Sequence, residues 1–589
     1  MAQNTIRIAN FSGSFADRHT AAREMIDGGP IDVLSGDFLA ELTMGYLVSW
    51  QKRNPKGGYV GSFFQQAKDV LVDCLEKNIK IVVNAGGLDP QGLVADLEAF
   101  AESEGLVAKF AYIEGDNLID RIDELQGQGE KFTNIDTGQD WSECQRELRT
   151  ANAYLGAWGI KEALDQGADV VIAPRVTDAA LVLGPAAWKF DWKRDDYDAL
   201  AGALTAGHII ECGPQACGGN YSFFEEVPSF DNIGFPIAEI EADGSFTITK
   251  HPGTGGLVSE GTVIAQLLYE VGPPAYANPD VVAHFDTARI EDQGNDRVRV
   301  TGVRGSMPPP THKVCINTFG GYVSTLTMAV GGLDVDAKAS IFADAWFKAI
   351  GGRQQFDEVS EEIIHSGHRK PRTIEESLSL FRISVKSTDK SKIGRAIAAG
   401  EVEVALGTVP GWVSTIATGG VQTKSFVVHW PAMVSSQHIV ERVNVAGKTI
   451  DVLPTQKVCN EERYYQKIPV AIPMAPAGDP VEMPFGRLFG TRAGDKGGNA
   501  NLGVWARSSE AYGFLYQFLT VEKLGQLLPD TAEFEIERYE LPNILALNFL
   551  IKGYLGEGVN ASTSMDGMAK SLGEYLRCQP ILVPDQLLP

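Results

Sequence analysis

The chain has 589 residues, which is too long for a single hydrophobic core, so two or three domains are expected. Apolar residues make up 44% of the chain, a proportion that excludes a largely disordered protein. The formal net charge is −25 at pH 7, and a charge of this sign disfavours nucleic acid and anionic membranes as binding partners.

The cysteines also limit the class of protein. There are seven of them, and no two form a Cys-x-x-Cys pair, so the pattern indicates neither a zinc ribbon nor a disulfide framework. The first residues lack the apolar run of a signal peptide, and no stretch approaches the ~18 apolar residues of a membrane-spanning helix. We therefore expect a reduced, cytoplasmic protein that makes no contact with a membrane.

Short β-branched segments alternate with helical patterns through residues 5–188. Strands are predicted at 5–11, 31–34, 79–83, 107–113 and 169–173. Amphipathic helices are predicted at 16–25, 38–50, 63–77, 92–101, 118–125, 151–164 and 179–188. Strands that alternate with helices form right-handed crossovers, which produce a parallel sheet. The predicted fold class of this region is therefore α/β, with a parallel, Rossmann-like sheet.

Each of these strands ends in a polar or glycine-containing turn. In a parallel sheet such turns lie along one edge, where α/β proteins bind ligands. The side chains expected at that edge are Asn10, Ser12, Asp37, Asn84, Glu114, Asp116, Arg175 and Asp178. For any one of them, a simple role as a helix N-cap is the alternative. For the set as a whole, we favour a functional site.

The segment 208–220 is dense in both glycine and functional groups. His208 and Glu211 form a pair suited to general acid/base catalysis, and Cys212 is a candidate nucleophile. The side chains of His208 and Glu211 share a helix face only if residues 208–211 are helical. The alternative is that His208 and the cysteines are inert core residues.

A second glycine-rich segment, Gly253-Thr254-Gly255-Gly256, lies between a predicted strand and a predicted helix. Its backbone amides are expected to hold a phosphate, with Lys250 and His251 adding positive charge. The segment matches neither a Walker A motif nor a dinucleotide fingerprint. A plain turn is the alternative.

A third such segment, 492–499, contains Asp495 and Lys496. We expect it to close over the main site or to form a subunit contact, with a surface ion pair as the alternative. Carboxylates of the strand-end set could also bind Mg²⁺, but no ligand spacing supports a metal site, and we assign no metal ligand.

Residues 200–473 mix strands with short helices, including a hairpin at 238–250. Residues 474–483 are rich in proline and small residues and are expected to be a linker. Strands and helices then alternate in a pattern typical of a ferredoxin-like α+β sandwich. The predicted domains are an α/β core at 1–473, with a further division near 200–235, and a ferredoxin-like domain at 484–589.

Several stretches resemble the AtuA-like family, the acyclic terpene utilisation proteins. The similar stretches lie at 21–25, 28–34, 84–88, 151–156, 175–181, 207–220 and 253–258. The Gly494-Asp495-Lys496-Gly497 segment resembles the ferredoxin-like domain appended in that family, and Pro174 is a small departure. The resemblance implies a role in the breakdown of acyclic isoprenoids through acyl-CoA thioesters, but it implies no catalytic residues.

Two functional hypotheses follow. In the first, the protein is a lyase or hydratase that acts on a branched acyl-CoA by general acid/base catalysis, with CoA present only as part of the substrate. Glu114 or Asp178 is assigned as the base, and His208 as a further acid/base group. Asn84 and Asn152 are assigned as hydrogen-bond donors to an oxyanion or a carboxylate, and Arg175 as the residue that binds a carboxylate. The expected site for a CoA phosphate consists of Lys250, Gly253, Thr254, Gly255 and Gly256. In the second, it is a non-catalytic scaffold or binding subunit beside an acyl-CoA carboxylase. A homo-oligomer is expected in either case.

Overall fold

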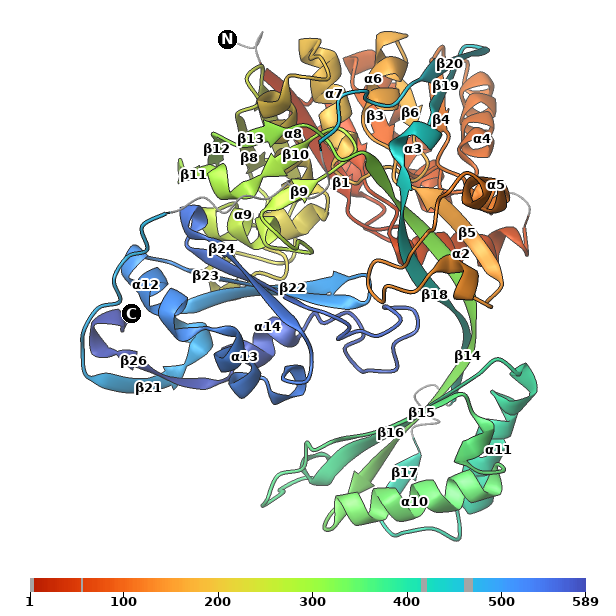
Figure 1. The fold of residues 1–589 in the computed structure, drawn as a ribbon, viewed down its shortest axis with the longest axis vertical. Coiled ribbons are helices and arrows are strands. Elements are labelled where there is room, and N and C mark those ends of the chain that lie inside the picture. Colours follow the sequence, from red (N-terminus) through yellow and green to blue (C-terminus); the bar gives the residue numbers. More distant parts are fainter. Residues whose placement is uncertain (1–4, 55–56, 415–420, 460–469, 589) are drawn as a thin grey trace. The chain divides into compact units, whose positions relative to one another are not determined.

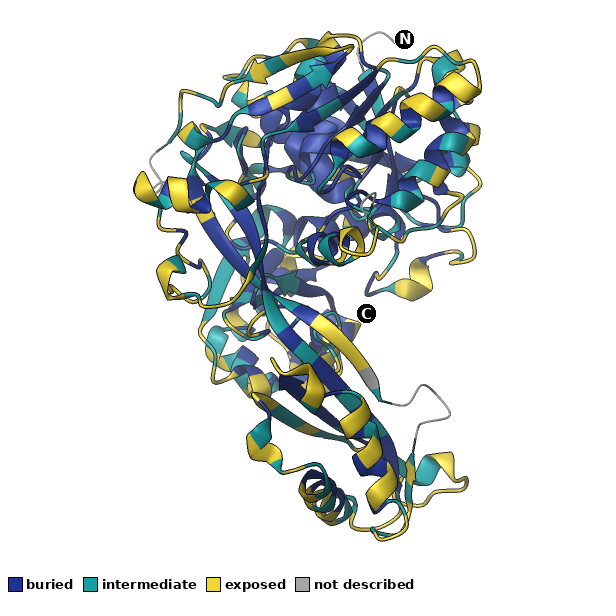
Figure 2. Cartoon of the chain, turned by 90° about the vertical axis from the view of Figure 1, so that its right-hand side faces the viewer, coloured by how far each residue is buried: buried dark blue, intermediate teal, exposed yellow. Residues whose placement is uncertain are grey.

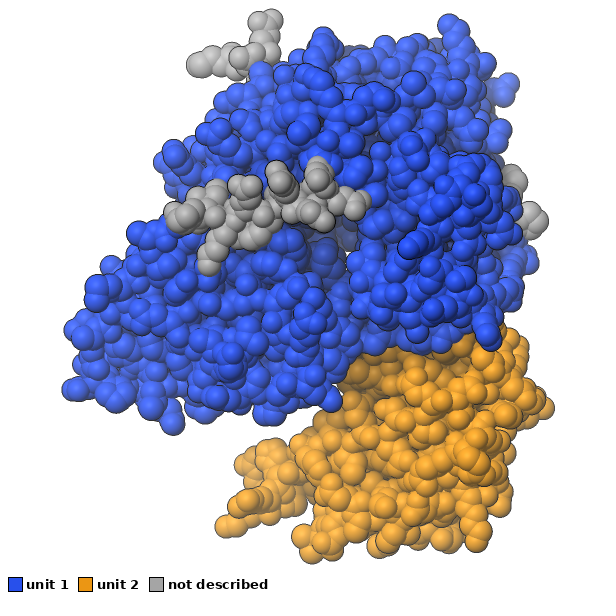
Figure 3. Space-filling view, in the orientation of Figure 1, with its two compact units in different colours: residues 1–317, 429–559, 568–589 blue, residues 318–428, 560–567 orange. Residues whose placement is uncertain are grey.

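The computed structural model describes residues 5–54, 57–414, 421–459 and 470–588. The chain groups into two compact units, which Figure 3 shows in blue and orange. Unit 1 comprises residues 1–317, 429–559 and 568–589, and unit 2 comprises residues 318–428 and 560–567. Within the described part of the chain, no helix is long and apolar enough to cross a membrane.

A mixed sheet of eleven strands forms the centre of unit 1 (Figure 1). Its five inner strands are parallel, in the order β1-β2-β3-β6-β4, and are β1 (Thr5–Ser12), β2 (Val33–Gly36), β3 (Lys80–Val83), β6 (Val170–Ile172) and β4 (Phe110–Glu114). Antiparallel strands extend the sheet at both edges. Beside β1 lie, in order, β7 (Pro236–Glu241), β8 (Phe246–Lys250), β12 (Val298–Thr301) and β11 (Arg289–Asp292). Beside β4 lie β19 (Glu441–Val445) and β20 (Lys448–Val452). The five predicted parallel strands are thus present. The Rossmann-like sheet is not confirmed, because the sheet is mixed.

Alternate residues of the inner strands are buried in two separate cores, one on each face of the sheet. Ile6 and Val82 belong to one core, and Phe11 and Val83 belong to the other. Strand side chains alternate between faces, so strands covered on both sides must be apolar throughout. Figure 2 shows these strands mostly in dark blue, with exposed residues on the outer faces of the helices.

Helices supply the other half of both cores. They are α1 (Ala21–Asp27), α2 (Glu41–Gln51), α3 (Gly61–Lys77), α4 (Pro90–Ser103), α5 (Ile122–Gly127), α6 (Trp158–Asp165), α7 (Ala180–Phe190), α8 (Tyr197–Ile210) and α9 (Glu260–Leu267). Buried residues of α1, α3 and α4 pack on one face, and those of α6, α7 and α8 pack on the other. The α/β crossovers expected from the sequence are therefore present.

The predicted helix at 151–164 is wrong in its first half. Residues Leu148–Ala153 form strand β5, which pairs with β14 (Thr311–Gly331), and helix α6 begins only at Trp158. Asn317 Nδ2 donates to Thr150 Oγ1 at 3.0 Å, and Tyr154 N donates to Lys313 O at 2.8 Å. Pairing with a strand distant in sequence overrides the helical propensity of the alanines.

Unit 1 also contains the C-terminal domain, which has a core of its own. Its antiparallel sheet has the order β22 (Phe489–Lys496), β23 (Asn499–Ala506), β25 (Ala546–Ile551) and β24 (Ile536–Leu541). Helices α12 (Ser509–Phe518), α13 (Val521–Leu527) and α14 (Leu572–Arg577) and the strand pair β21 (Pro480–Pro484) and β26 (Pro580–Pro584) accompany the sheet. The predicted ferredoxin-like domain is confirmed. The segment 492–496, expected to lie in a turn, forms the end of β22.

A three-stranded sheet completes the described part of unit 1, with β9 (Ala275–Ala277), β10 (Val282–His284) and β13 (Arg304–Ser306). Unit 2 is built on β15 (Glu358–Ile364), β16 (Leu378–Ser387), β17 (Trp412–Ser414) and the distal parts of β14 and β18 (Gln422–Ser435), with helices α10 (Val335–Ala349) and α11 (Arg395–Val404). Phe342, Trp346 and Phe381 lie in its core.

Two buried carboxyl groups meet the start of α6. Glu441 accepts hydrogen bonds from Gly159 N at 2.7 Å and Gly156 N at 3.3 Å, and Asp280 accepts one from Ala157 N at 3.0 Å. Burial raises the pKa of Glu441 to about 8, with the charge of Asp280 adding to the effect. Glu441 therefore stays protonated in the folded protein at pH values at which it ionises in the unfolded chain.

This raised pKa makes stability depend on pH in a defined direction. Between about pH 4.5 and 8 the folded state binds more protons at Glu441 than the unfolded state does, so the free energy of unfolding falls as pH rises, by at most about 1.4 kcal/mol per pH unit. Glu441→Gln replaces the titrating carboxyl group by a neutral amide. The free energy of unfolding of the variant should therefore rise relative to that of wild type as pH increases from 5 to 8. Urea unfolding across that range measures the difference. The exposed variant Glu102→Gln serves as the control, and parallel curves for E441Q and wild type would contradict the assignment.

Candidate functional site

The guanidinium of Arg175 lies just beyond the end of β6 and is 2% exposed. Its Nη1 donates to Leu39 O at 3.2 Å, Val176 O at 3.0 Å and Asp178 Oδ1 at 2.7 Å. The guanidinium carbon also lies 4.1 Å from the ring centroid of Tyr154. A buried charge needs such compensation because burial removes its hydration. Arg175 and Asp178, two predicted site residues, are therefore directly paired.

Asn84 ends β3 and is fully buried. Its Oδ1 accepts a hydrogen bond from Phe38 N at 2.7 Å, and its Nδ2 donates to Asp37 Oδ1 at 2.5 Å. Both ends of the amide are thus used within the protein. These contacts let Asn84 position Asp37, and its role as a donor to the ligand stays a prediction.

Asn152 is also buried, on β5, and it bonds to another strand-end carboxyl group. Its Nδ2 donates to Asp116 Oδ2 at 2.7 Å, and Arg175 N approaches the same oxygen at 3.4 Å. Burial raises the pKa of Asp116 to about 6. Five members of the predicted strand-end set, Asp37, Asn84, Asp116, Arg175 and Asp178, therefore lie near one another, and Asn152 joins them from β5, which is not part of the parallel sheet.

His208 lies in the last turn of α8, so the helical condition for a His208–Glu211 pair is met. His208 Nδ1 lies 3.1 Å from Glu211 Oε1, and the His208 ring stacks on Phe285 with centroids 5.4 Å apart. Burial lowers the pKa of His208 to about 4, and the charge of Lys496 contributes. Burial also raises the pKa of Glu211 well above its ordinary value. At neutral pH the imidazole of His208 is therefore neutral, and Glu211 holds its proton to a higher pH than an ordinary glutamate does.

A second group of charges, which the sequence did not predict, lies beside Arg175. Glu41, in the first turn of α2, accepts hydrogen bonds from Tyr154 Oη at 2.6 Å and Lys313 Nζ at 3.1 Å. Burial opposes the ionisation of Glu41, but nearby positive charges, that of Lys313 first, hold its pKa well below the ordinary value. Glu41 is therefore an ionised carboxylate.

The C-terminal domain adds a further cation to the same region. Lys496, the last residue of β22, donates from Nζ to Glu270 O at 2.8 Å. The charges of Lys313, Glu270, Glu41 and Glu211 all act on Lys496. The C-terminal domain therefore reaches the groups gathered at the sheet edge.

These charged groups line a recess within unit 1. The side chains of Asp178, Glu41 and Lys313 are 29%, 31% and 33% exposed, yet burial is the largest influence on the pKa of each. Because these side chains keep some exposure although protein atoms surround them closely, we call the region that they occupy the recess. We define the recess by Asp37, Glu41, Arg175, Asp178, Glu211, Glu270, Lys313 and Lys496.

The pKa values of the carboxyl groups in the recess are displaced in opposite directions. Burial raises the pKa of Asp37 well above its ordinary value, and the charge of Asp178 adds to this effect. Burial also raises the pKa of Asp178, against the opposing effect of Arg175. Glu41, by contrast, is ionised. Carboxyl groups whose pKa values are displaced in opposite directions within one site are typical of general acid/base catalysis.

Other predicted site residues have structural partners elsewhere. Glu114 accepts a hydrogen bond from Asn444 Nδ2 at 3.0 Å, on the strand added beside β4. The charge of Glu114 is not among those that shift the pKa values of Asp37, Asp178 or Glu211. The structure therefore does not bring Glu114 together with the recess.

The predicted phosphate segment, residues 253–256, is tied to the protein by its own contacts. Lys250 Nζ pairs with Asp296 Oδ2 at 2.9 Å and donates to Thr254 O at 3.1 Å, and His251 Nε2 contacts Met25 O at 3.0 Å. Helix α9 begins only at Glu260 and is capped by Ser259. These contacts account for Lys250, Gly253, Thr254, Gly255 and Gly256 as a structural turn, so their predicted role with CoA stays a prediction.

Burial raises the pKa of Cys212 well above its ordinary value, which makes it a poor nucleophile. All seven cysteines are free. Among the described residues, no group of three or more His, Cys, Asp or Glu side chains is arranged to hold a metal ion.

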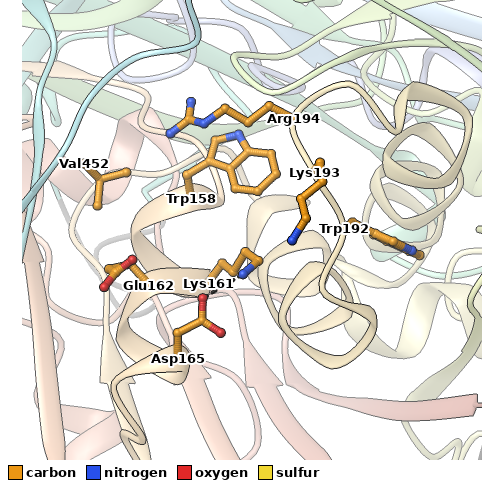
Figure 4. Close-up of a pocket in the computed structure, with 8 residues that line it drawn as sticks. All are labelled: Trp158, Lys161, Glu162, Asp165, Trp192, Lys193, Arg194 and Val452. Atoms are coloured by element: carbon orange, nitrogen blue, oxygen red, sulfur yellow. Dashed lines mark hydrogen bonds and ion pairs between the residues drawn. The ribbon is translucent and has the colours of Figure 1, made fainter.

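A separate pocket of about 260 Å³ lies between α6, the connection from α7 to α8, and β20 (Figure 4). It is lined by Trp158, Lys161, Glu162, Asp165, Trp192, Lys193, Arg194 and Val452. Its cations already have partners, since Lys161 pairs with Asp165 at 2.6 Å and Arg194 lies 4.8 Å from the Trp158 ring centroid. The recess is the better candidate site.

The recess residues missed by sequence reasoning are Glu41, Glu270 and Lys313, and so is Tyr154, which donates a hydrogen bond to Glu41. The sequence does not indicate a functional role for Glu41, because acidic residues are common in the first turn of a helix. Glu270 follows α9 with φ at 56°, a conformation that the sequence does not indicate. Lys313 joins the site only through the pairing of β14 with β5, which is not a local property of the sequence.

The fold and the recess can now be set beside known proteins. The family model described as acyclic terpene utilisation family protein AtuA matches residues 6–445, and the model of the AtuA ferredoxin-like domain matches residues 483–582. Neither the curated proteins nor the solved structures contain a match. The two matched regions cover most of the chain and include every residue of the recess. The chain therefore belongs to the acyclic terpene utilisation family.

Proposed function

We propose that the protein is an enzyme of acyclic isoprenoid breakdown that acts on an acyl-CoA thioester, with lyase or hydratase chemistry. Family membership supports the role in acyclic terpene utilisation. The thioester and the reaction class go beyond that membership and depend on the recess. The observation that carries them is that Asp37, bonded to Asn84, and Asp178, paired with Arg175, lie in one region, where burial first and the charge of Asp178 second raise the pKa of Asp37.

Two carboxyl groups that repel each other's charge retain a proton at a pH at which an ordinary aspartate has lost it. One group of the pair can then accept a proton while the other donates one. Both candidate reactions need such an exchange. Asn84 holds Asp37, and Arg175 holds Asp178, so the two groups are fixed before a ligand binds.

In a hydration, Asp178 would accept a proton from water, the oxygen would add to the β-carbon, and Asp37 would protonate the α-carbon. In a retro-aldol cleavage, Asp178 would accept the proton of the 3-hydroxyl group, the bond between C2 and C3 would break, and Asp37 would protonate C2. Both reactions place negative charge on the thioester oxygen in the transition state. The cations of the recess, Arg175, Lys313 and Lys496, supply the stabilising field.

Thioester binding can be tested without knowing the reaction. A ligand that binds only the folded state raises the melting temperature of the protein. The shift becomes larger as the ratio of ligand concentration to dissociation constant increases. We expect 3-methylcrotonyl-CoA and 3-hydroxy-3-methylglutaryl-CoA to raise it by more than free CoA at the same concentration. Differential scanning fluorimetry makes the comparison. If no CoA species shifts the melting temperature, the scaffold hypothesis is favoured over the enzyme, and co-purification with carboxylase subunits would be examined next.

The role of Asp178 can be tested by one substitution. Asp178→Asn keeps the shape of the side chain and removes its ability to accept a proton, so turnover of the thioester that binds should fall by about 10²-fold or more. The exposed variant Asp123→Asn is the matched control and should turn over as wild type does. Steady-state kinetics with a parallel melting curve separates catalysis from folding. Wild-type turnover by a folded D178N protein would remove Asp178 from the mechanism.

A further inference from the structure

Lys496 is a cation of the recess that lacks a carboxylate partner. Its Nζ donates to the neutral carbonyl oxygen of Glu270 at 2.8 Å. Over the described part of the chain, no carboxylate oxygen lies within 4.0 Å of this nitrogen. Arg175 and Lys313, the other cations of the recess, pair with Asp178 at 2.7 Å and Glu41 at 3.1 Å. An ammonium group has three donors, so Lys496 has donors left for a further acceptor.

The surroundings of Lys496 favour an anion. Lys496 is only partly exposed, and burial lowers its pKa, with the positive charge of Lys313 as the next contribution. Two ammonium groups that act on each other within a desolvated region gain when an anionic oxygen binds near both. The acidic groups that act on Lys496 have other partners: Glu270 pairs with Lys570 at 3.2 Å, Glu41 accepts from Tyr154 Oη at 2.6 Å, and Glu211 lies 3.1 Å from His208 Nδ1.

The position of Lys496 is fixed by a buried polar network at the junction with the C-terminal domain. Asn501 accepts a hydrogen bond from Glu270 N at 2.8 Å and donates to Val271 O at 3.1 Å. Asn548 donates to Val271 O at 2.9 Å and to Gly272 O at 2.8 Å. Both asparagines are fully buried, and together they hold Glu270 at a φ of 56°. The carbonyl that receives Lys496 is therefore held in place by the domain that supplies Lys496.

The strand that carries Lys496 approaches closely because of a glycine. Arg492, Gly494 and Lys496 alternate along β22 and so share one face of the strand. A Cβ atom at Gly494 would lie 2.6 Å from Tyr269 Cε2, which is closer than carbon atoms approach. Glycine at this position lets β22 lie against Tyr269 and brings the end of the strand to the recess. This gives a physical reason for the sequence Gly494-Asp495-Lys496.

We propose that Lys496 binds an anionic oxygen of the ligand, so that the C-terminal domain contributes a binding residue to the recess. The anion is either a free carboxylate on the acyl chain or a phosphate of CoA. The inference rests on the proposed function for the identity of the ligand as a thioester. The anion site itself rests on the contacts of Lys496.

The test compares glutaryl-CoA with pentanoyl-CoA, which carries a methyl group where glutaryl-CoA carries its carboxylate. Free CoA and free glutarate are the other two probes, and isothermal titration calorimetry measures binding. The variants are Lys496→Gln and Lys496→Arg, which keeps the charge. Arg507→Gln is the matched control, since Arg507 also joins the C-terminal domain to the rest of unit 1, through Glu226 at 2.7 Å, but is 56% exposed.

We expect wild type to bind glutaryl-CoA at least about tenfold more tightly than pentanoyl-CoA, which corresponds to about 1.4 kcal/mol. K496Q should lose this preference, K496R should keep part of it, and R507Q should bind as wild type does. If K496Q binds both thioesters and free CoA more weakly than wild type by the same factor, the anion site is supported, with a phosphate of CoA as the anion. Unchanged binding of every probe by K496Q would overturn the proposal, as would a wild-type protein that binds none of them.

The two proposals can fail separately. If wild type binds glutarate but no CoA species, and K496Q does not bind glutarate, the anion site stands and the thioester function is wrong. If K496Q does not fold, acetylation of Lys496 in the wild-type protein by acetic anhydride provides a second measurement, read by mass spectrometry. Glutaryl-CoA should slow that acetylation relative to an exposed lysine, and an unchanged rate would overturn the proposal.

Discussion

A full positive charge buried at the end of a central strand is the constraint on which the site depends. Arg175 cannot be hydrated at 2% exposure, so the protein must surround it with acceptors. It does so with two carbonyl groups, the Asp178 carboxylate and the face of Tyr154. These partners come from three segments, so one guanidinium ties the start of α2, the end of β5 and the end of β6 to each other.

The recess follows from this arrangement. Leu39, whose carbonyl accepts from Arg175, lies between Asp37 and Glu41, so fixing that carbonyl also fixes the two acids on either side of it. Asn84 holds Asp37 from β3, and Tyr154 holds Glu41 from the end of β5. The C-terminal domain contributes Lys496 to the recess and fixes Glu270 through a hydrogen bond from Glu270 N to Asn501. Charges from distant parts of the sequence therefore act on one another in a single desolvated region.

The sequence predicts the parts of this site that have local causes. Asn84, Arg175 and Asp178 were found because a short apolar strand followed by a polar turn is readable within about ten residues, and parallel pairing brings such turns together. The His208–Glu211 pair also has a local cause, because the two residues share a helix face if the stretch is helical, and α8 continues to Ile210. The ferredoxin-like domain was predicted because each of its elements has its own periodicity.

The remainder depends on pairings between distant segments. Residues 148–153 look helical but form β5, because β14 supplies the hydrogen bonds of a strand, and the same pairing delivers Lys313. Glu114 was included because it ends a strand, yet β19 adds to that edge of the sheet and Asn444 occupies its carboxylate. The antiparallel additions on both sides of the five parallel strands, which make the sheet mixed, likewise have no local signal in the sequence.

The recess also retains polar atoms that the described protein groups leave unsatisfied. Arg175 Nε, Asn152 Oδ1 and Glu211 Oε2 are buried and have no hydrogen-bond partner there. Each such atom costs about 1–3 kcal/mol of stability. These atoms lie on Arg175, on Glu211 and on the asparagine that bonds to Asp116, at the same sheet edge where the pKa values of several acids are displaced. Other buried polar atoms without a partner occur elsewhere in the described chain, but these three lie next to the charged groups of the candidate site. Such a cost is expected where a site is preorganised for a ligand rather than for maximal stability.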